Sequence, residues 1–260
     1  MSRRLPWGRL LVAAIGAVLV LFIVGPLLRL LFRASPASLM NAFRDPELGQ
    51  AILLTLFTAT TATAIGALLG IPLAYTMART TFPGRRLLKG IIDLPVVIPH
   101  PVAGIALILF LGRRSPLGGT LANLGLEFVS HVPGIIAAML FVSAPILVSG
   151  AREAFAAVDP HLERVARSLG DPPWTAFRRI TLPLAGRGIL AAAILAWARS
   201  VSEFGAIVVI TYNPKVASVY LFDRFTSFGL NAAIPAAVIL LLVALAVFAL
   251  AWFLDRRELQ

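Results

Sequence analysis

Six apolar segments constrain this chain more than any other feature of its sequence. They lie at about residues 10–32, 51–75, 91–111, 134–150, 188–210 and 232–254. Each is close to the ~20 residues that a helix needs to cross the hydrocarbon core of a bilayer. In lipid, helices satisfy all their own backbone hydrogen bonds, which irregular chain does not. The sequence therefore predicts an all-α integral membrane protein with about six transmembrane helices.

The composition favours the same class of protein. Of the 260 residues, 59% are hydrophobic and only 13% are charged, whereas soluble domains carry about 25% charged residues. The net charge of +11 comes from basic residues scattered over short loops, so no nucleic-acid partner is expected. Because the chain has no cysteine, disulfides, thiolate metal sites and cysteine nucleophiles are excluded. We expect neither a cofactor nor a metal site.

The distribution of Lys and Arg predicts the orientation of the spans. Cytoplasmic loops collect basic residues. With the N-terminus inside, 15 of the 23 basic residues fall on the cytoplasmic side and 7 on the outer side, so both termini are expected in the cytoplasm. The first segment could instead be a cleaved signal peptide, because three arginines precede it. Its apolar run is longer than the core of such a signal, and we interpret it as a span.

The longest polar stretch, residues 151–187, is predicted to form two short cytoplasmic helices. An Asp-Pro pair at 159–160 is a helix start signal,, and Gly170 is a stop signal. A second Asp-Pro pair at 171–172 predicts another start, and this helix is expected to end at Pro183. Helices of about ten residues are marginal in water on their own. These two must therefore pack on the membrane surface, on neighbouring spans or on a soluble partner.

This stretch also resembles the EAA loop of ABC importer permeases. The matching positions are Ala166, Gly170, Phe177, Ile180, Leu182 and Pro183. Arg164 and Val165 stand where the family often has Glu and Ala, and Glu163 lies one position earlier. The resemblance implies that the loop docks on a cytoplasmic ATP-binding subunit and transmits its movement to the spans. The coupling residues that it implies are Glu163, Arg164, Ala166, Arg167, Ser168, Gly170, Asp171, Pro172 and Trp174.

The chain itself has no phosphate-binding G-x-x-x-x-G-K-[ST] motif,. We therefore expect it to be a transport subunit without its own ATPase site, so that ATP hydrolysis belongs to a partner.

The fifth apolar segment contains charges that are costly in a membrane. The spacing i, i+3, i+4 and i+7 predicts one helix face formed by Arg199, Ser202, Glu203 and Ala206,. A charged side chain at mid-membrane costs roughly 2.5–3.5 kcal/mol on insertion scales, so it usually faces a bundle interior or an aqueous path. The pair of Arg199 and Glu203 is thus interpreted either as a structural ion pair or as part of a gate.

Three prolines close to His100 predict a break in the third apolar segment, because each removes a backbone donor,. Irregular backbone at membrane depth is tolerated where it is buried in protein or lines a cavity. The break is either a simple kink at the start of the span or part of a pathway.

Both stretches are similar to one group of permeases. The run from Arg199 to Ala206 resembles the R-x-x-x-E-F-G-A signature of molybdate, tungstate and sulfate permeases. The runs DLPVVIPHPVAG at 93–104 and YNPKVASVYLFDRFTSFGL at 212–230 resemble the tungstate/molybdate branch. The resemblance covers nearly the whole chain from the second segment onward. It implies a type I ABC importer permease fold, with residues 1–260 as a single permease domain in the cell membrane. The pathway or gate residues that it implies are Pro99, His100, Arg199, Ser202, Glu203, Phe204 and Gly205.

The resemblance implies import of a tetrahedral oxyanion, tungstate or molybdate, by alternating access. The implied partners are two ATP-binding subunits, a second copy of the permease and an extracytoplasmic oxyanion-binding protein. The alternatives are a sulfate or thiosulfate permease, a secondary transporter driven by an ion gradient, and a membrane-embedded hydrolase. No internal repeat is evident, which does not favour a secondary transporter. His100, His131 and His161 lie at separate places in the predicted topology, which does not favour a metallohydrolase.

Overall fold

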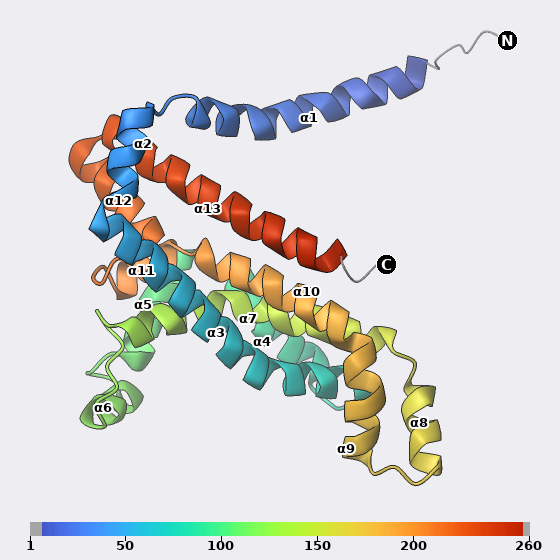
Figure 1. Ribbon diagram of the computed structural model, residues 1–260. Helices are drawn as coiled ribbons and strands as arrows, with labels where there is room; N and C mark the ends of the chain where they lie inside the picture. Colours follow the sequence, from blue (N-terminus) through green and yellow to red (C-terminus); the bar gives the residue numbers. More distant parts are fainter. Residues whose placement is uncertain (1–6, 257–260) are drawn as a thin grey trace, which may run out of the picture. The chain divides into compact units, whose positions relative to one another are not determined.

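The computed structural model describes residues 7–256, and over this range the chain is built from helices (Figure 1). Thirteen α-helices and one π-helical turn are found there, and no strand. Among these residues five helices are long and apolar enough to cross a membrane, or six spans result if one bent pair counts as a span. The prediction of an all-α membrane protein with about six spans is confirmed.

The spans differ in length from the predicted segments. The long helices are α1 (Trp7–Leu31), α3 (Pro46–Arg79), α7 (Val132–Ala157), α10 (Leu182–Val201) and α13 (Leu230–Arg256). Helix α7 continues past Gly150, where the apolar segment ended, into polar residues. Hydropathy marks only the part of a helix that is apolar, whereas the backbone hydrogen bonds continue beyond it. The shorter helices are α2 (Pro36–Phe43), α4 (Arg85–Val97), α5 (His100–Leu111), α6 (Pro116–Asn123), α8 (Pro160–Ser168), α9 (Pro173–Ala176), α11 (Gly205–Ile210) and α12 (Ala217–Phe228), and the π-helical turn η1 is Phe177–Thr181.

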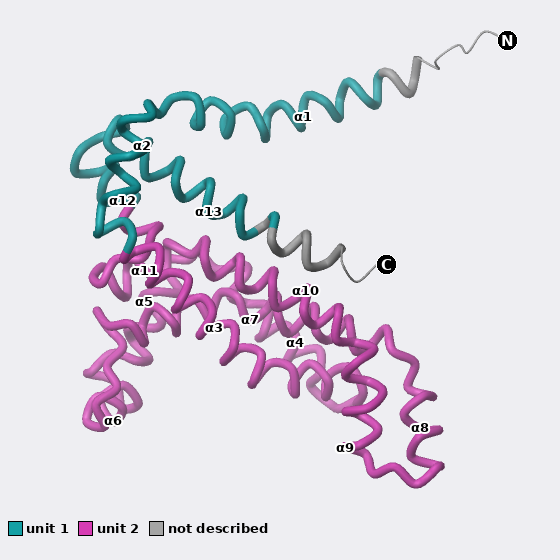
Figure 2. The backbone as a smooth tube through the Cα atoms, viewed as in Figure 1, with its two compact units in different colours: residues 1–49, 221–260 teal, residues 50–220 magenta. Residues whose placement is uncertain are grey.

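The helices form two compact units, which Figure 2 shows in different colours. Unit 2 comprises residues 50–220, and unit 1 comprises the residues on either side of them. Within unit 2, α8 and α9 lie at one end of the long helices, and α6 lies at the other end (Figures 1 and 2). Within unit 1, Arg224 of α12 pairs with Asp45, the residue before α3, at 3.2 Å.

Two long helices of unit 2, α7 and α10, pack closely because small residues face each other. A Cβ atom built on Gly150 of α7 would lie 2.6 Å from Cβ of Ala192 on α10. The reciprocal contact joins Gly188 of α10 to Ala154 of α7, also at 2.6 Å. In lipid there is no hydrophobic force between helices, so close van der Waals packing of small residues holds them together.

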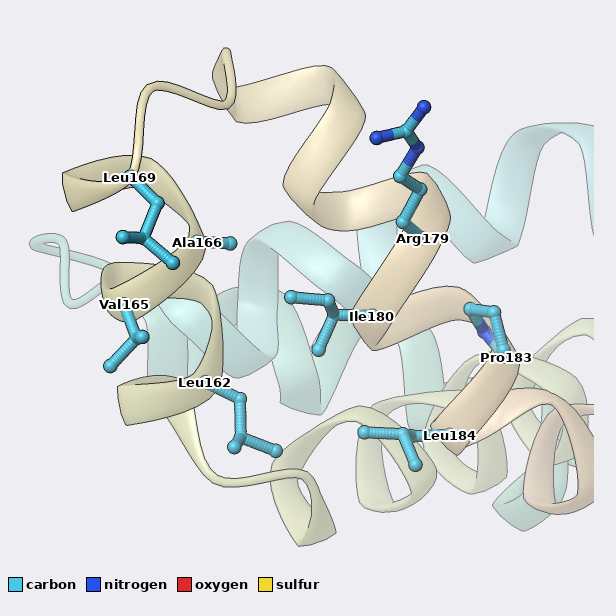
Figure 3. A pocket seen from close by; sticks show the side chains of 8 residues that line it. All are labelled: Leu162, Val165, Ala166, Leu169, Arg179, Ile180, Pro183 and Leu184. Carbon is cyan, nitrogen blue, oxygen red and sulfur yellow. The ribbon is translucent and has the colours of Figure 1, made fainter.

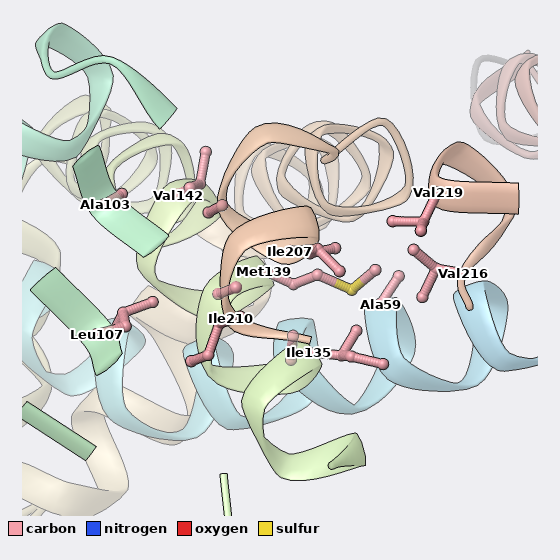
Figure 4. Packing of buried hydrophobic residues seen from close by; sticks show 13 residues of the cluster. Ala59, Ala103, Leu107, Ile135, Met139, Val142, Ile207, Ile210, Val216 and Val219 are labelled. Atoms are coloured by element: carbon pink, nitrogen blue, oxygen red, sulfur yellow. The ribbon is translucent and has the colours of Figure 1, made fainter. Parts of the chain in front are cut away.

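The core of unit 2 gathers around the short helix α11. Figure 4 shows Ile207 of α11 beside Met139 of α7. These two side chains, Ile210 of α11 and Ile135 of α7 are all buried in one cluster. A helix of six residues is not stable by itself. Its apolar side chains are enclosed by neighbouring helices, so tertiary packing keeps it helical.

The third apolar segment is broken as predicted. Helices α4 and α5 meet at Ile98 and Pro99 with a bend of 114°. Only Pro99 lies at the break. Pro95 lies inside α4, and Pro101 lies in the first turn of α5, where the missing N–H has no partner within the helix.

We predict that Gly150→Ala will destabilise the packing of α7 on α10. The added methyl group overlaps Ala192, and overpacking of this kind costs typically 1–3 kcal/mol. The melting temperature of the purified protein in detergent should fall. Gly186→Ala is the matched control, because a Cβ on this glycine of α10 meets nothing within 4 Å. An equal or smaller effect at Gly150 than at Gly186 would contradict the proposed contact.

Candidate functional site

The first helix of the polar loop begins and ends as the sequence predicts. The carboxylate of Asp159 accepts a hydrogen bond from the backbone N–H of His161 at 2.8 Å, and Pro160 opens α8. After α8, Gly170 has a φ of +104°, a conformation that only glycine adopts without strain. These two signals set the length of α8.

The second helix differs from the prediction at both ends. Asp171 does not cap it, because Pro172 precedes α9 and no side chain caps the first turn. Asp171 instead lies 3.9 Å from Arg179. The predicted end at Pro183 is also wrong, because α9 continues through η1 into α10. In η1 the N–H of Leu182 bonds to the carbonyl of Phe177, five residues back. This wider turn lets the helix pass a proline that would clash in a regular α-helix.

The carboxylate of Glu163 joins α8 to two other elements. It accepts hydrogen bonds from the hydroxyl of Tyr75 on α3, at 3.1 Å, and from the hydroxyl of Thr181 in η1. Arg79, at the end of α3, lies 3.7 Å from it and donates a hydrogen bond of 2.9 Å to the carbonyl of Val158 after α7. Glu163 therefore faces the ends of the spans, and its side chain is only 17% exposed.

Tyr75, which bonds this carboxylate, belongs to a cluster of four aromatic rings. Tyr75 lies edge-on to Phe155 and Phe177, with centroids 5.3 and 4.7 Å away. Trp174 stacks on Phe177 at 5.4 Å but is largely exposed. Aromatic pairs of this geometry add about 0.5–1.5 kcal/mol beyond the area they bury. The base of the loop is thus held by apolar and polar contacts together.

The opposite side of α8 is open. Arg164, Arg167 and Ser168 are exposed there and line a polar hollow together with Asp171. Ala166, between them in sequence, is buried. One residue step turns a helix by about 100°, which is why Glu163 and Arg164 face different surroundings.

An apolar groove of about 540 Å³ separates α8 from η1 and the start of α10 (Figure 3). Leu162 and Leu184 point towards each other across it, and Ile180 points towards α8. Leu169, at the edge of the groove, is 84% exposed. An exposed apolar surface with polar residues around it is typical of a protein interface. The lining residues are Leu162, Val165, Ala166, Leu169, Arg179, Ile180, Pro183 and Leu184.

A second cluster, formed by His100, Arg199 and Glu203, lies where two spans are interrupted. Helix α10 ends at Val201 and α11 begins at Gly205, so Glu203 lies between helices. The prediction of one continuous helix face through this region is therefore wrong. The physical reason is that the Glu203 side chain accepts the N–H of Ala206 at 2.8 Å, which replaces a bond that the interrupted helix loses.

One oxygen of Glu203 brings the cluster together. Its Oε2 atom lies 2.8 Å from Nδ1 of His100 and 2.9 Å from Nη2 of Arg199. The same Nη2 lies 2.9 Å from each ring nitrogen of His100. The guanidinium also donates to the hydroxyl of Ser202, at 3.4 Å. Four of the seven predicted pathway residues thus meet at one point.

The other three predicted residues shape the backbone here. Pro99 lies at the break before α5, and Phe204 lies at the break before α11. A Cβ on Gly205 would lie 2.8 Å from Cβ of His100, so the two breaks are in direct contact. Ser218, which sequence reasoning missed, donates a hydrogen bond of 2.7 Å to the carbonyl of Glu203. No pattern in the sequence points to this long-range bond.

The cluster is arranged as an ion pair with a histidine beside it. No group of three His, Asp or Glu side chains suited to a metal is found among the described residues. The Glu203 side chain is fully buried, whereas those of Arg199 and His100 are 24% and 35% exposed. A solute that reaches this cluster therefore meets its cationic side.

Comparison with known proteins gives three consistent results. Residues 66–260 match the family model "Binding-protein-dependent transport system inner membrane component". A molybdate/tungstate transport system permease protein of Thermococcus kodakarensis is 40% identical over 95% of this chain and 96% of its own length. A sulfate transport system permease protein of Escherichia coli is 32% identical over 81% of this chain and 74% of its own.

Solved structures show the same fold. A chain of a bacterial ABC transporter involved in the import of the acidic polysaccharide alginate superposes with a TM-score of 0.75 over 95% of both chains. The two chains are 21% identical, so this similarity concerns the fold.

We predict that Glu163→Ala will loosen the polar loop. The change leaves Tyr75, Thr181 and Arg79 without their shared acceptor, and a buried group without its partner costs about 1–3 kcal/mol. Trypsin should cut after Arg164 or Arg167 faster than in the wild-type protein in detergent. Glu153→Ala is the control, because the Glu153 side chain is 73% exposed and its salt bridge is to the adjacent Arg152. Equal cleavage rates in the two variants would contradict the role of Glu163.

Proposed function

This chain belongs to the family of binding-protein-dependent transport system inner membrane components, and on this basis we propose that it is the permease subunit of an ATP-driven importer of tungstate or molybdate. It is a multi-pass membrane protein. The observation that supports the substrate is the 40% identity to a molybdate/tungstate permease over nearly the full length of both chains. Both termini would lie in the cytoplasm.

ATP hydrolysis would belong to a cytoplasmic partner that docks on the polar loop. The loop offers an apolar groove and an exposed basic face on α8. Its opposite face is bonded to α3 and to η1 through Glu163. A partner that pushes α8 would therefore move the ends of these spans. The complete transporter would contain two permease copies, two ATP-binding subunits and an extracytoplasmic oxyanion-binding protein.

The two interrupted spans would line the translocation pathway. Unsatisfied backbone is expensive in lipid, so broken helices are tolerated where they face protein or water. The breaks at Pro99 and Phe204 touch each other and carry the cluster of His100, Arg199 and Glu203. During alternating access, a rearrangement of these breaks would open the pathway to either side.

Sulfate is the second candidate substrate. It is also a tetrahedral dianion, and a sulfate permease is among the relatives. That relative is less similar, at 32% identity over a smaller share of both chains, which favours tungstate or molybdate.

We predict ATP-driven uptake of tungstate and molybdate by the reconstituted transporter. The chain would be placed in liposomes with its ATP-binding subunit and its binding protein, and uptake of each anion would be measured with and without ATP. Uptake should require both partners and should persist in a large excess of sulfate. Preferred uptake of sulfate would assign the second candidate instead, and uptake without ATP would overturn the proposal.

We also predict that Gly170→Val will weaken association with the ATP-binding subunit. Residues other than glycine are strained at a φ of +104°, by about 1–3 kcal/mol, so the turn between α8 and α9 should change shape. Co-purification of the two subunits measures the effect. Gly90→Ala, in the interior of α4 with no atom near the new Cβ, should leave the complex intact. Normal co-purification of the Gly170 variant would argue against docking at this loop.

A further inference from the structure

We propose that Arg199 and His100 form a binding site for the tetrahedral oxyanion inside the permease, and that Glu203 is the internal counter-anion of this site. When the oxyanion is absent, the carboxylate binds the donors that the anion binds when it passes. This inference rests on the proposed function, because it assumes that an oxyanion reaches the interrupted spans. Beyond that function, Arg199 and His100 are assigned as the residues that contact the anion, and Glu203 as the group that competes with the anion for them.

The two oxygens of Glu203 have different partners. Oε1 accepts the backbone N–H of Ala206 at 2.8 Å and so has a structural task at the start of α11. Among the described residues, Oε2 is paired with the side chains of Arg199 and His100, at 2.9 and 2.8 Å. These are the distances and donors by which proteins bind anions through charge-assisted hydrogen bonds. An oxyanion could therefore take over Arg199 and His100 when these two side chains turn away from Oε2, while Oε1 stays bonded to Ala206.

The side chains of this cluster differ in their exposure to solvent. The Glu203 side chain is fully buried, whereas Arg199 and His100 are 24% and 35% exposed. The exposed hydroxyl of Ser202 lies beside the guanidinium, at 3.4 Å. An anion that approaches from the open side meets donors first and the carboxylate last.

Arg199 is separated from the other charged residues on helices α5, α7, α10 and α11. Helices α5 and α11 contain no Lys, Arg, Asp or Glu. On α10 the other basic residue is Arg187, about 18 Å away at 1.5 Å per residue. On α7 the charged residues, Arg152 and Glu153, lie in its last turns. Within these four helices, Arg199 is thus the only arginine near the breaks that can attract a dianion.

Competition between the oxyanion and Glu203 also has a mechanical consequence. The contact of Oε2 with His100 joins the start of α5 to the break between α10 and α11. An anion that takes over Arg199 and His100 removes this link between the two interrupted spans. Passage of the anion is thereby coupled to a loosening of the breaks through which it moves.

The test uses the full-length chain in detergent. Its melting temperature is measured at increasing concentrations of sodium molybdate, and sodium chloride at the same ionic strength is the reference. Glu203→Gln keeps an oxygen for Ala206 but frees Arg199 from its counter-anion. We expect the molybdate concentration at half-maximal stabilisation to fall about tenfold relative to the wild-type protein. Adding Arg199→Gln to this variant should abolish the response, and adding His100→Asn should weaken it.

Asp45→Asn is the matched control, because it removes the carboxylate charge from an arginine–carboxylate pair of 3.2 Å elsewhere in the chain. It should leave the response to molybdate unchanged. An equal gain in Asp45→Asn, no gain in Glu203→Gln, or a full response without Arg199 would each overturn the proposal.

If Glu203→Gln is not recovered as a folded protein, the molybdate response of the Arg199→Lys variant is compared with that of the wild-type protein instead. This variant keeps the charge but loses the forked donor, so a weaker molybdate response is expected, and an unchanged one would overturn the site. The proposed function is tested separately by uptake. Molybdate uptake by the wild-type transporter together with no molybdate response in any variant would reject this site alone.

Discussion

The buried carboxylate of Glu203 is the group on which the middle of unit 2 depends. It replaces a lost backbone bond at the start of α11, and it contacts side chains from both interrupted spans. A charge taken out of water is costly unless it is paired and hydrogen-bonded, and each oxygen of Glu203 has such a partner. Because Gly205 at the start of α11 lies close against His100 at the start of α5, the position of this carboxylate determines how the two breaks fit together.

A second carboxylate, that of Glu163, has a comparable place at the end of the same unit. It bonds α8 to α3 and to η1, which runs directly into α10. Helix α10 then extends for 20 residues, about 30 Å, and ends next to the break that carries Glu203. One continuous helix thus links the polar loop with the intramembrane cluster. Close packing of small residues against α7 makes it move with that helix.

Local signals were reliable at the first helix of the polar loop and failed at the second, where Asp171 does not cap α9. The cap at Asp159 and the left-handed turn at Gly170 depend on residues within a few positions, and both were predicted. The predicted end at Pro183 was wrong because η1 absorbs the proline. The unbroken fifth span was wrong because hydropathy does not distinguish a continuous apolar helix from two helices joined at a buried polar residue. Residues His100, Arg199 and Glu203 were each found in the sequence, but their convergence required contacts over about one hundred residues.

The sequence by itself determined the membrane class, the approximate spans, the two-part loop and the family resemblance, because hydropathy, capping residues and motif spacing are local properties of the chain. Only the tertiary structure decided which way each polar side chain of the loop faces. Glu163 turns to the spans while Arg164 turns to solvent, although they are adjacent. The tertiary structure also decided that the two interrupted spans meet at a single carboxylate. These outcomes depend on how helices distant in sequence pack, and no local pattern records that packing.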